Sequence, residues 1–185
     1  MDMINFILSF FLSKNLSLLT AFLCWDSGQV LNLQRIGALR GVRIKFAFVE
    51  VEVLPVDGMH REGVVLDVGC PKAAALLQQA TSTRAFNYRY SWLLLHNASF
   101  DQSVAEELLA AAEVLPDADV ILATADLLVD VYRVKTREPL LFTPLPLCVN
   151  STQWELTVVW NALPSVPSRR KNLNNVYLKA VATVC

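Results

Sequence analysis

The sequence predicts an α/β fold of three layers, in which helices cover both faces of a mostly parallel, doubly wound sheet. The stretch Tyr90–Leu95 is apolar without alternation from Trp92 onward, which is typical of a strand buried on both faces. Alanine-rich stretches with helical periodicity flank it at residues 71–83 and 101–115. A strand, a helix start and a helix follow one another three times along the chain, and such a series forms a parallel sheet with right-handed crossovers.

The composition limits the kinds of partner. The 185 residues suit one domain, and 54% of them are apolar, against about 45–50% in a typical soluble domain. The formal net charge of −1 provides no basic surface for nucleic acid. None of the six glycines lies in a G-x-G-x-x-G or G-x-x-x-x-G-K pattern, and the four cysteines lack the spacing of metal ligands. We therefore expect no nucleotide, no zinc ion and no other cofactor.

Residues 3–25 are mostly apolar, with a polar break in the middle. We interpret them as a short helix over 3–14, a polar turn and a buried strand over 18–25. Two alternatives stay open. A signal peptide would lack its usual basic start, because Asp2 occupies that region. A membrane span would place Lys14 near the middle of the bilayer.

A helix and an edge strand are expected next. Asp26 can cap a helix while Gln29 reaches back to it, and Gly41 provides the stop. Over residues 42–53 apolar positions alternate with charged ones at first, which predicts a strand at or near a sheet edge. The alternation changes phase at residues 48–49, so a bulge, a bend or a second strand is expected there.

The middle of the chain continues the strand–helix order. Residues 64–69 are the next predicted strand, and Pro71 is expected at the first helical position. After the central strand, Ser99 and Gln102 predict a second capping box. Further strands are expected at residues 119–124 and, as an antiparallel pair, at 129–134 and 140–143. The prolines at positions 144, 146, 164 and 167 predict an irregular C-terminal linker.

Cys70 is the main candidate for chemistry. It lies between a strand and a helix start that would favour a thiolate, and His96 at the end of the next strand could be its base. No local nucleophile signature supports this hypothesis. In the usual strand order of doubly wound folds, Cys24 and Cys70 end adjacent parallel strands. They are therefore a disulfide candidate, within the usual Cα separation of about 4.4–6.8 Å, and two separate buried thiols are the alternative.

Three Asn-x-Ser/Thr sequons are glycosylation candidates, at Asn15, Asn97 and Asn150. About one is expected by chance at this composition, so three favour a secreted context. Accidental polar tripeptides in loops are the alternative. The three cations of residues 168–171 could form a basic patch, but we interpret them as a solvated linker.

The C-terminal third carries a family resemblance. The run Asp130-Val131-Tyr132-Arg133, the Pro139-Leu140 pair, Trp154 and the segment 168–180 (SRRKNLNNVYLKA) resemble the insect ionotropic receptors. These are chemosensory relatives of the ionotropic glutamate receptors. The similarity is greatest to the extracellular amino-terminal region of the seventy-five subgroup, whose central strand resembles residues 86–97 as well. Asn175 departs from the pattern, because the family usually has Gly there.

The resemblance implies a lobe like those of periplasmic binding proteins, located on the extracellular side of the cell membrane. Residues 1–163 would be this receptor domain, and 164–185 a linker and the start of a ligand-binding domain. Because that domain and its membrane spans would follow Cys185, the chain is expected to be a fragment or a truncated product. The resemblance implies that the protein is a glycoprotein and that it belongs to a receptor of the acid- or amine-sensing branch. Its partners would be the rest of its own chain and co-receptor subunits in a tetrameric cation channel, and a small organic ligand would bind only the missing domain.

Two other functions compete with the receptor. The first is a soluble thiol-dependent α/β enzyme that uses Cys70, and the second is a small-ligand binding module without a channel. In the receptor interpretation, residues 176–184 are a strand without its own sheet, because its neighbours belong to the next domain. We therefore expect the chain from about Pro164 onward to pack poorly on the α/β body, or to form a frayed strand or helix with few contacts.

Overall fold

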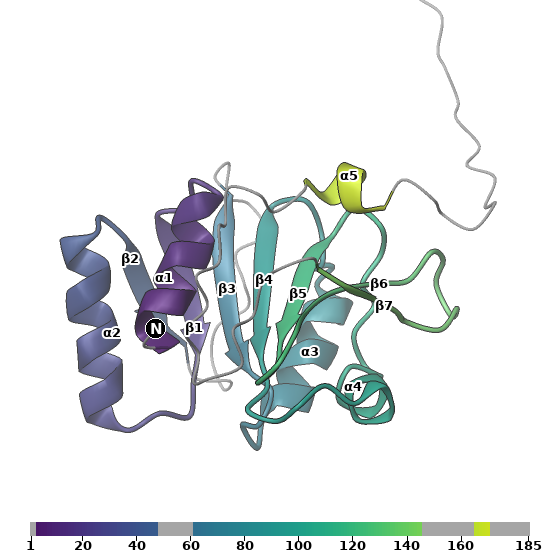
Figure 1. Ribbon diagram of the computed structural model, residues 1–185, viewed down its shortest axis with the longest axis horizontal. Helices are drawn as coiled ribbons and strands as arrows, with labels where there is room; N and C mark the ends of the chain where they lie inside the picture. The colour runs from purple at the N-terminus through teal and green to yellow at the C-terminus, as the bar shows by residue number, and fades with distance from the viewer. Residues whose placement is uncertain (1–2, 48–60, 146–164, 171–185) are drawn as a thin grey trace, which may run out of the picture.

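A computed structural model of the chain describes residues 3–47, 61–145 and 165–170 (Figure 1). Helices and strands alternate through most of this length, which confirms the predicted α/β fold. In chain order the elements are α1 Met3–Ser13, β1 Leu18–Phe22, α2 Ser27–Leu39, β2 Arg43–Phe46, β3 Glu62–Asp67, α3 Ala73–Ser82, β4 Tyr90–Leu95, α4 Gln102–Leu108, β5 Asp119–Ala123, β6 Leu128–Tyr132, β7 Leu141–Pro144 and α5 Val166–Arg169.

The described strands form one sheet in the order β2-β1-β3-β4-β5-β6-β7. The first five of these pair in parallel, and β6 and β7 are antiparallel to their neighbours. The order reverses between β1 and β3, which makes their carboxyl ends the switch point of a doubly wound sheet. The predicted parallel set, the antiparallel pair and the neighbouring positions of β1 and β3 are all confirmed, and the fold is consistent with a periplasmic-binding-protein-like lobe.

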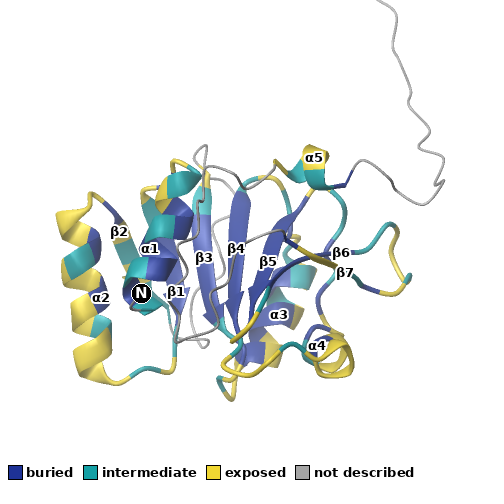
Figure 2. Cartoon of the chain, in the orientation of Figure 1, coloured by how far each residue is buried: buried dark blue, intermediate teal, exposed yellow. Residues whose placement is uncertain are grey.

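Helices cover the sheet on both faces, which confirms the predicted layers (Figure 1). Alternate residues of each central strand enter two separate apolar clusters: Trp92 and Leu94 pack with α3 and α4, whereas Leu93 and Leu95 pack with α1 and α2. All six residues of β4 are buried, as are the neighbouring strands β3 and β5 over most of their length (Figure 2). The Nε1–H of Trp92 donates a 3.2 Å hydrogen bond to the Ala85 carbonyl, so the largest core side chain has its polar atom paired.

The predicted order of helix, turn and strand is present at the start of the chain, although β1 ends at Phe22 and not at residue 25. Five side chains of α1 are fully buried, namely Phe6, Ile7, Leu8, Phe10 and Phe11. Asn15 adopts a positive φ of 57° in the turn that leads to β1. None of the helices in the described ranges is long and apolar enough to span a membrane.

The next two elements also follow the sequence pattern. The Asp26 carboxylate accepts a hydrogen bond from the Gln29 backbone N–H at 2.9 Å, and the Gln29 side chain accepts one from the Asp26 N–H at 3.3 Å, so the capping box is present. Gly41 has the positive φ, 74°, that a helix stop requires. Strand β2 lies at the sheet edge as predicted. The phase change at residues 48–49 lies outside the described residues.

The starts of α3 and α4 were predicted wrongly. Pro71 precedes α3 by two residues, because the Ala73 N–H donates to the Cys70 carbonyl at 2.9 Å and closes a tight turn around the proline. Helix α4 is capped by Asp101 instead of Ser99, because the Asp101 carboxylate accepts the backbone N–H groups of residues 103 and 104. Val104 in this helix is 40% exposed.

Replacing Gly63 by Ala should destabilise the domain. A Cβ at this position would lie 2.4 Å from Cδ1 of Phe11, so the buried ring must move. Overpacking of this kind costs about 1–3 kcal/mol, which corresponds to a fall in melting temperature of about 2–12 °C for a chain of this size. The measurement is thermal unfolding of Gly63→Ala, Phe11→Leu and the double variant. We expect the double variant to lose less stability than the sum of the two single variants, and strict additivity would contradict the contact.

Candidate functional site

The carboxyl edge of the parallel strands is where doubly wound folds usually bind ligands, in the crevice at the switch point. In this chain Cys24 follows β1 and Cys70 follows β3, and a disulfide joins them across that crevice with a Cα–Cα distance of 5.6 Å. Cys24 is exposed and Cys70 is half-buried. While the bond is intact, Cys70 has no thiolate that could act as a nucleophile.

The other candidate of the enzyme hypothesis is His96, the predicted base. His96 is half-buried, and its backbone N–H donates to the Ala123 carbonyl at 2.8 Å.

A cavity of about 350 Å³ opens between the starts of α1 and α2, with Trp25, Asp26 and Asn32 in its lining. A second, of about 390 Å³, lies elsewhere, beside Arg84 and Glu113. In the described part of the chain no three His, Cys, Asp or Glu side chains lie together as metal ligands.

Two of the three sequons lie on the described surface. Asn15 is exposed in the turn after α1, and Asn97 is exposed between β4 and α4. Asn150 lies outside the described residues.

The opposite edge of the sheet holds a buried charge network that no local sequence signal had predicted. We define the network as Lys14, Asp119, Asp130, Arg169 and Arg170. The two carboxylates come from neighbouring antiparallel strands, Asp119 from the start of β5 and Asp130 from β6. Side chains at alternate positions of a strand lie on the same face of the sheet. Residues two positions away from Asp119 and from Asp130 belong to the apolar cluster that packs against α1. Both carboxylates therefore point toward the α1 face.

Asp119 has three partners from three separate parts of the chain. It forms an ion pair with Lys14 at the end of α1, and its Oδ2 accepts a 2.5 Å hydrogen bond from the Ser91 hydroxyl. Its Oδ1 accepts a 2.9 Å bond from Nη2 of Arg169. Burial alone would raise the pKa of this carboxyl, but the Lys14 ammonium, Ser91 and Arg169 together hold the pKa at about 2.

Lys14 shows the opposite balance. Burial lowers its pKa, and the attraction of Asp119 only partly offsets that effect, with the cations of Arg169 and Arg61 adding to the lowering. Lys14 also lies over the Phe10 ring, 4.5 Å from its centroid. The surroundings therefore favour the ionised form of Asp119 but disfavour the ionised form of Lys14. The net contribution of this ion pair to folding stability is smaller than the pKa shift of Asp119 alone suggests.

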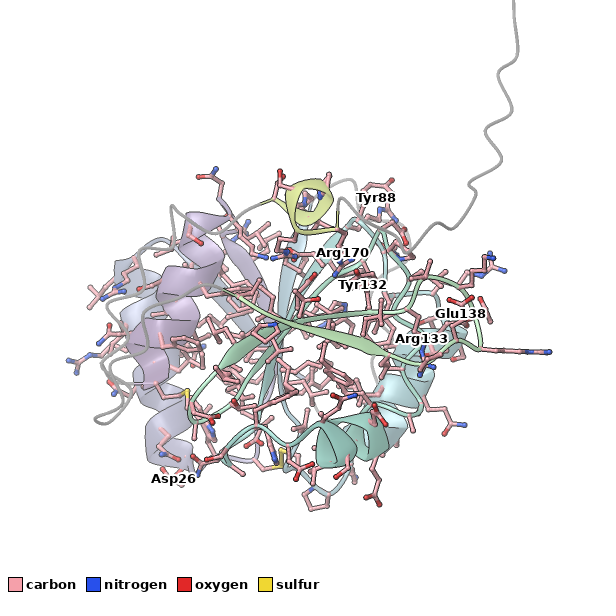
Figure 3. All side chains as sticks on the ribbon, turned by 45° about the vertical axis from the view of Figure 1, so that its right-hand side comes forward. Asp26, Tyr88, Tyr132, Arg133, Glu138 and Arg170 are labelled. Atoms are coloured by element: carbon pink, nitrogen blue, oxygen red, sulfur yellow. A yellow bond between two sulfur atoms is a disulfide. The ribbon has the colours of Figure 1, made fainter. Side chains whose placement is uncertain are left out.

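Asp130 is fully buried and holds both arginines. Arg170 binds it bidentately, with Nε and Nη2 each donating at 2.8 Å, and Nη2 of Arg169 lies 3.1 Å from the same carboxylate. Figure 3 shows Arg170 beneath α5 with Tyr132 beside it. The guanidinium carbon lies 4.3 Å from the centroid of the Tyr132 ring.

The interpretation of residues 168–171 as a solvated linker is therefore wrong for Arg169 and Arg170. Their side chains are only 3% and 2% exposed. The expectation that the chain packs poorly from Pro164 onward is also wrong for Arg169 and Arg170, whereas Ser165, Pro167 and Ser168 are exposed and residues 171–185 lie outside the described ranges. The physical reason is that two buried carboxylates need cationic partners. The available signal was an aspartate inside each of two apolar strands, Asp119-Val-Ile-Leu and Leu-Val-Asp130-Val.

Comparison with known proteins gives one match. The family model described as ionotropic receptor 75a N-terminal matches residues 1–183, a range that includes the disulfide and the charge network. No curated protein matches the chain, and no solved structure does.

Replacing Asp119 by Asn should reduce the loss of stability in acid. The folded pKa of about 2 is below the ordinary 3.8, so as pH falls the unfolded chain takes up the proton first. The carboxylate's contribution, about 2 kcal/mol, is present above about pH 4 and disappears as the pH falls toward 2. Urea unfolding at several pH values measures it, with the exposed neighbour substituted as control, Asp117→Asn. Equal losses between pH 4 and 2 in wild type and Asp119→Asn would contradict the role of Asp119.

Proposed function

The chain belongs to the ionotropic receptor 75a N-terminal family, and on that premise we propose that it forms the extracellular amino-terminal domain of a chemosensory receptor subunit. The observation that carries the proposal is the family match over residues 1–183. The fold supports it, because a lobe of this kind can serve as a recognition or assembly module without catalysis.

Two surface features support an extracellular location. Disulfides persist in oxidising compartments and are rare in the cytosol, and the Cys24–Cys70 bond lies where reductants would reach it, since Cys24 is exposed. The sequons at Asn15 and Asn97 are exposed as well. We propose that the folded domain carries N-linked glycans and this disulfide on the outer side of the cell membrane.

In this proposal the domain is one part of a ligand-gated cation channel. Its partners are the remainder of the receptor chain, which follows residues 165–170, and co-receptor subunits. The small organic ligand binds the ligand-binding domain and not this lobe. The disulfide supports that division, because it joins the ends of the two strands between which a doubly wound sheet usually takes a ligand.

The enzyme hypothesis has less support. It needs a free Cys70 thiolate within hydrogen-bond reach of a base, whereas Cys70 is bonded to Cys24. The matching family is a receptor domain and not an enzyme family. The binding-module hypothesis would have to use a cavity other than the switch-point crevice.

Secretion from insect cells should yield a glycosylated domain. Treatment with an N-glycosidase should increase the electrophoretic mobility of the wild type, because exposed Asn15 and Asn97 are accessible to the transferase. Asn15→Gln and Asn97→Gln should each remove one step of that shift, and Asn150→Gln tests the third sequon. If none of the three sequons contributes a shift, the extracellular proposal fails.

Breaking the disulfide should lower stability without altering the fold. Replacing Cys24 and Cys70 by Ser removes a cross-link that spans 46 residues, which is expected to cost about 2–4 kcal/mol, or about 4–16 °C in melting temperature. Dithiothreitol should have the same effect on wild type and none on the double variant. Selective alkylation of native Cys70 at neutral pH, without reductant, would instead revive the enzyme hypothesis.

A further inference from the structure

Arg170 occupies a closely matched pocket at the end of the described chain. Besides its two bonds to Asp130, its guanidinium donates to three backbone carbonyls, those of Pro116, Ala118 and Val131, at 2.9, 2.7 and 3.3 Å. The Tyr132 ring covers one face of the group. These hydrogen-bond acceptors come from β6 and from the loop before β5.

This set of contacts selects a guanidinium over an ammonium. A planar, delocalised group with five N–H donors can bind a carboxylate bidentately, reach carbonyls on its other edges and stack on an aromatic ring at once. A lysine ammonium has three donors around a point and cannot make the parallel pair of bonds. The pocket is thus specific for the chemistry of arginine and not only for its charge.

The segment that carries Arg170 depends on this pocket. Helix α5 has only four residues, and a single turn is not stable in water by itself. Its Ser165 N-cap makes no side-chain capping bond, and none of its residues is buried as a whole. Arg169 and Arg170 supply the side-chain hydrogen bonds and ion pairs that join the described residues of this segment to the sheet and to the loop before β5.

We propose that Asp130, Tyr132 and the carbonyls of Pro116, Ala118 and Val131 form an intramolecular guanidinium-binding site, and that its occupant, Arg170, locks residues 165–170 to the sheet. The site does not depend on the proposed receptor function. Its consequence does rest on that function: in a receptor subunit the locked segment sets where the following chain leaves the domain.

Arg169 provides the matched comparison, because it lies next to Arg170, has the same charge and is equally inaccessible. It shares Asp119 and Asp130, but its Nε is buried without a hydrogen-bond partner among the described residues. The surroundings of Arg169 therefore recognise a positive charge, whereas those of Arg170 recognise the whole guanidinium. Substitution by Lys should separate the two residues.

The first test is thermal unfolding of the full chain with chemical rescue. Arg170→Lys should lower the melting temperature by about 4–10 °C, and Arg169→Lys by at most about 3 °C. Arg170→Gly leaves the site empty, so ethylguanidinium should raise its melting temperature more than ethylammonium does at the same concentration. The difference between the effects of the two cations should vanish in the wild type and in the double variant that carries both Arg170→Gly and Asp130→Asn. Equal effects of the two cations on Arg170→Gly would overturn the proposal.

The second test uses the wild type and so does not depend on any variant folding. Trypsin needs the arginine side chain in its own specificity pocket, so docking should protect the bonds after Arg169 and Arg170, while the exposed turn at Lys135 and Arg137 is cut as an internal control. Asp130→Asn should raise cleavage after Arg170 about tenfold for each 1.4 kcal/mol of lost docking free energy. Cleavage after Arg170 in native wild type as fast as at Arg137 would overturn the proposal. Neither test depends on secretion or glycosylation, so their failure is distinguishable from failure of the receptor proposal.

Discussion

Two carboxylates inside the sheet impose the constraint on which the rest of this structure depends. Asp119 and Asp130 lie on neighbouring strands with almost no access to water, and an ionised carboxylate in such surroundings requires paired cations. The cations come from distant parts of the chain: Lys14 is 105 residues from Asp119, Arg169 is 50 residues from it, and Arg170 is 40 residues from Asp130. The network thus ties the first helix and the last described helix to the middle strands, so assembly of the ends is coupled to assembly of the core.

The two edges of the parallel strands are closed by different chemistry. At the carboxyl edge, the disulfide between Cys24 and Cys70 bridges the two strands at which the order reverses. At the other edge, the arginines of the last segment and Lys14 close the sheet through ion pairs. A doubly wound domain usually leaves its switch-point crevice open for a ligand. Here the two strand ends at that position are cross-linked, so Cys70 is held in a disulfide and not as a free thiol.

Much of the fold could be predicted from the sequence because the signals are local. The apolar run of Tyr90–Leu95 marked the central strand, and Asp26 with Gln29 marked the start of α2. The start of α4 was missed because Ser99 and Asp101 are both good caps two residues apart, and only the tertiary contacts decide which face of the helix turns inward. Arg169 and Arg170 were missed for a different reason. Their local surroundings, prolines and further cations, are those of a solvated linker, whereas the carboxylates that bury them lie 40 or more residues away.

The charge network also connects the stability of the domain to the position of the segment that follows it. Withdrawing Arg170 leaves Asp130 fully buried without its bidentate cation, and breaking a buried pair in this way costs about 3–5 kcal/mol. Since a domain of ordinary stability has about 5–15 kcal/mol in total, the segment cannot leave its pocket without weakening the body substantially. A flexible linker would lack this property, because its contacts could be lost at little cost. In a receptor subunit, therefore, force or displacement applied to the following chain would reach strand β6 and the loop before β5 directly through Arg170.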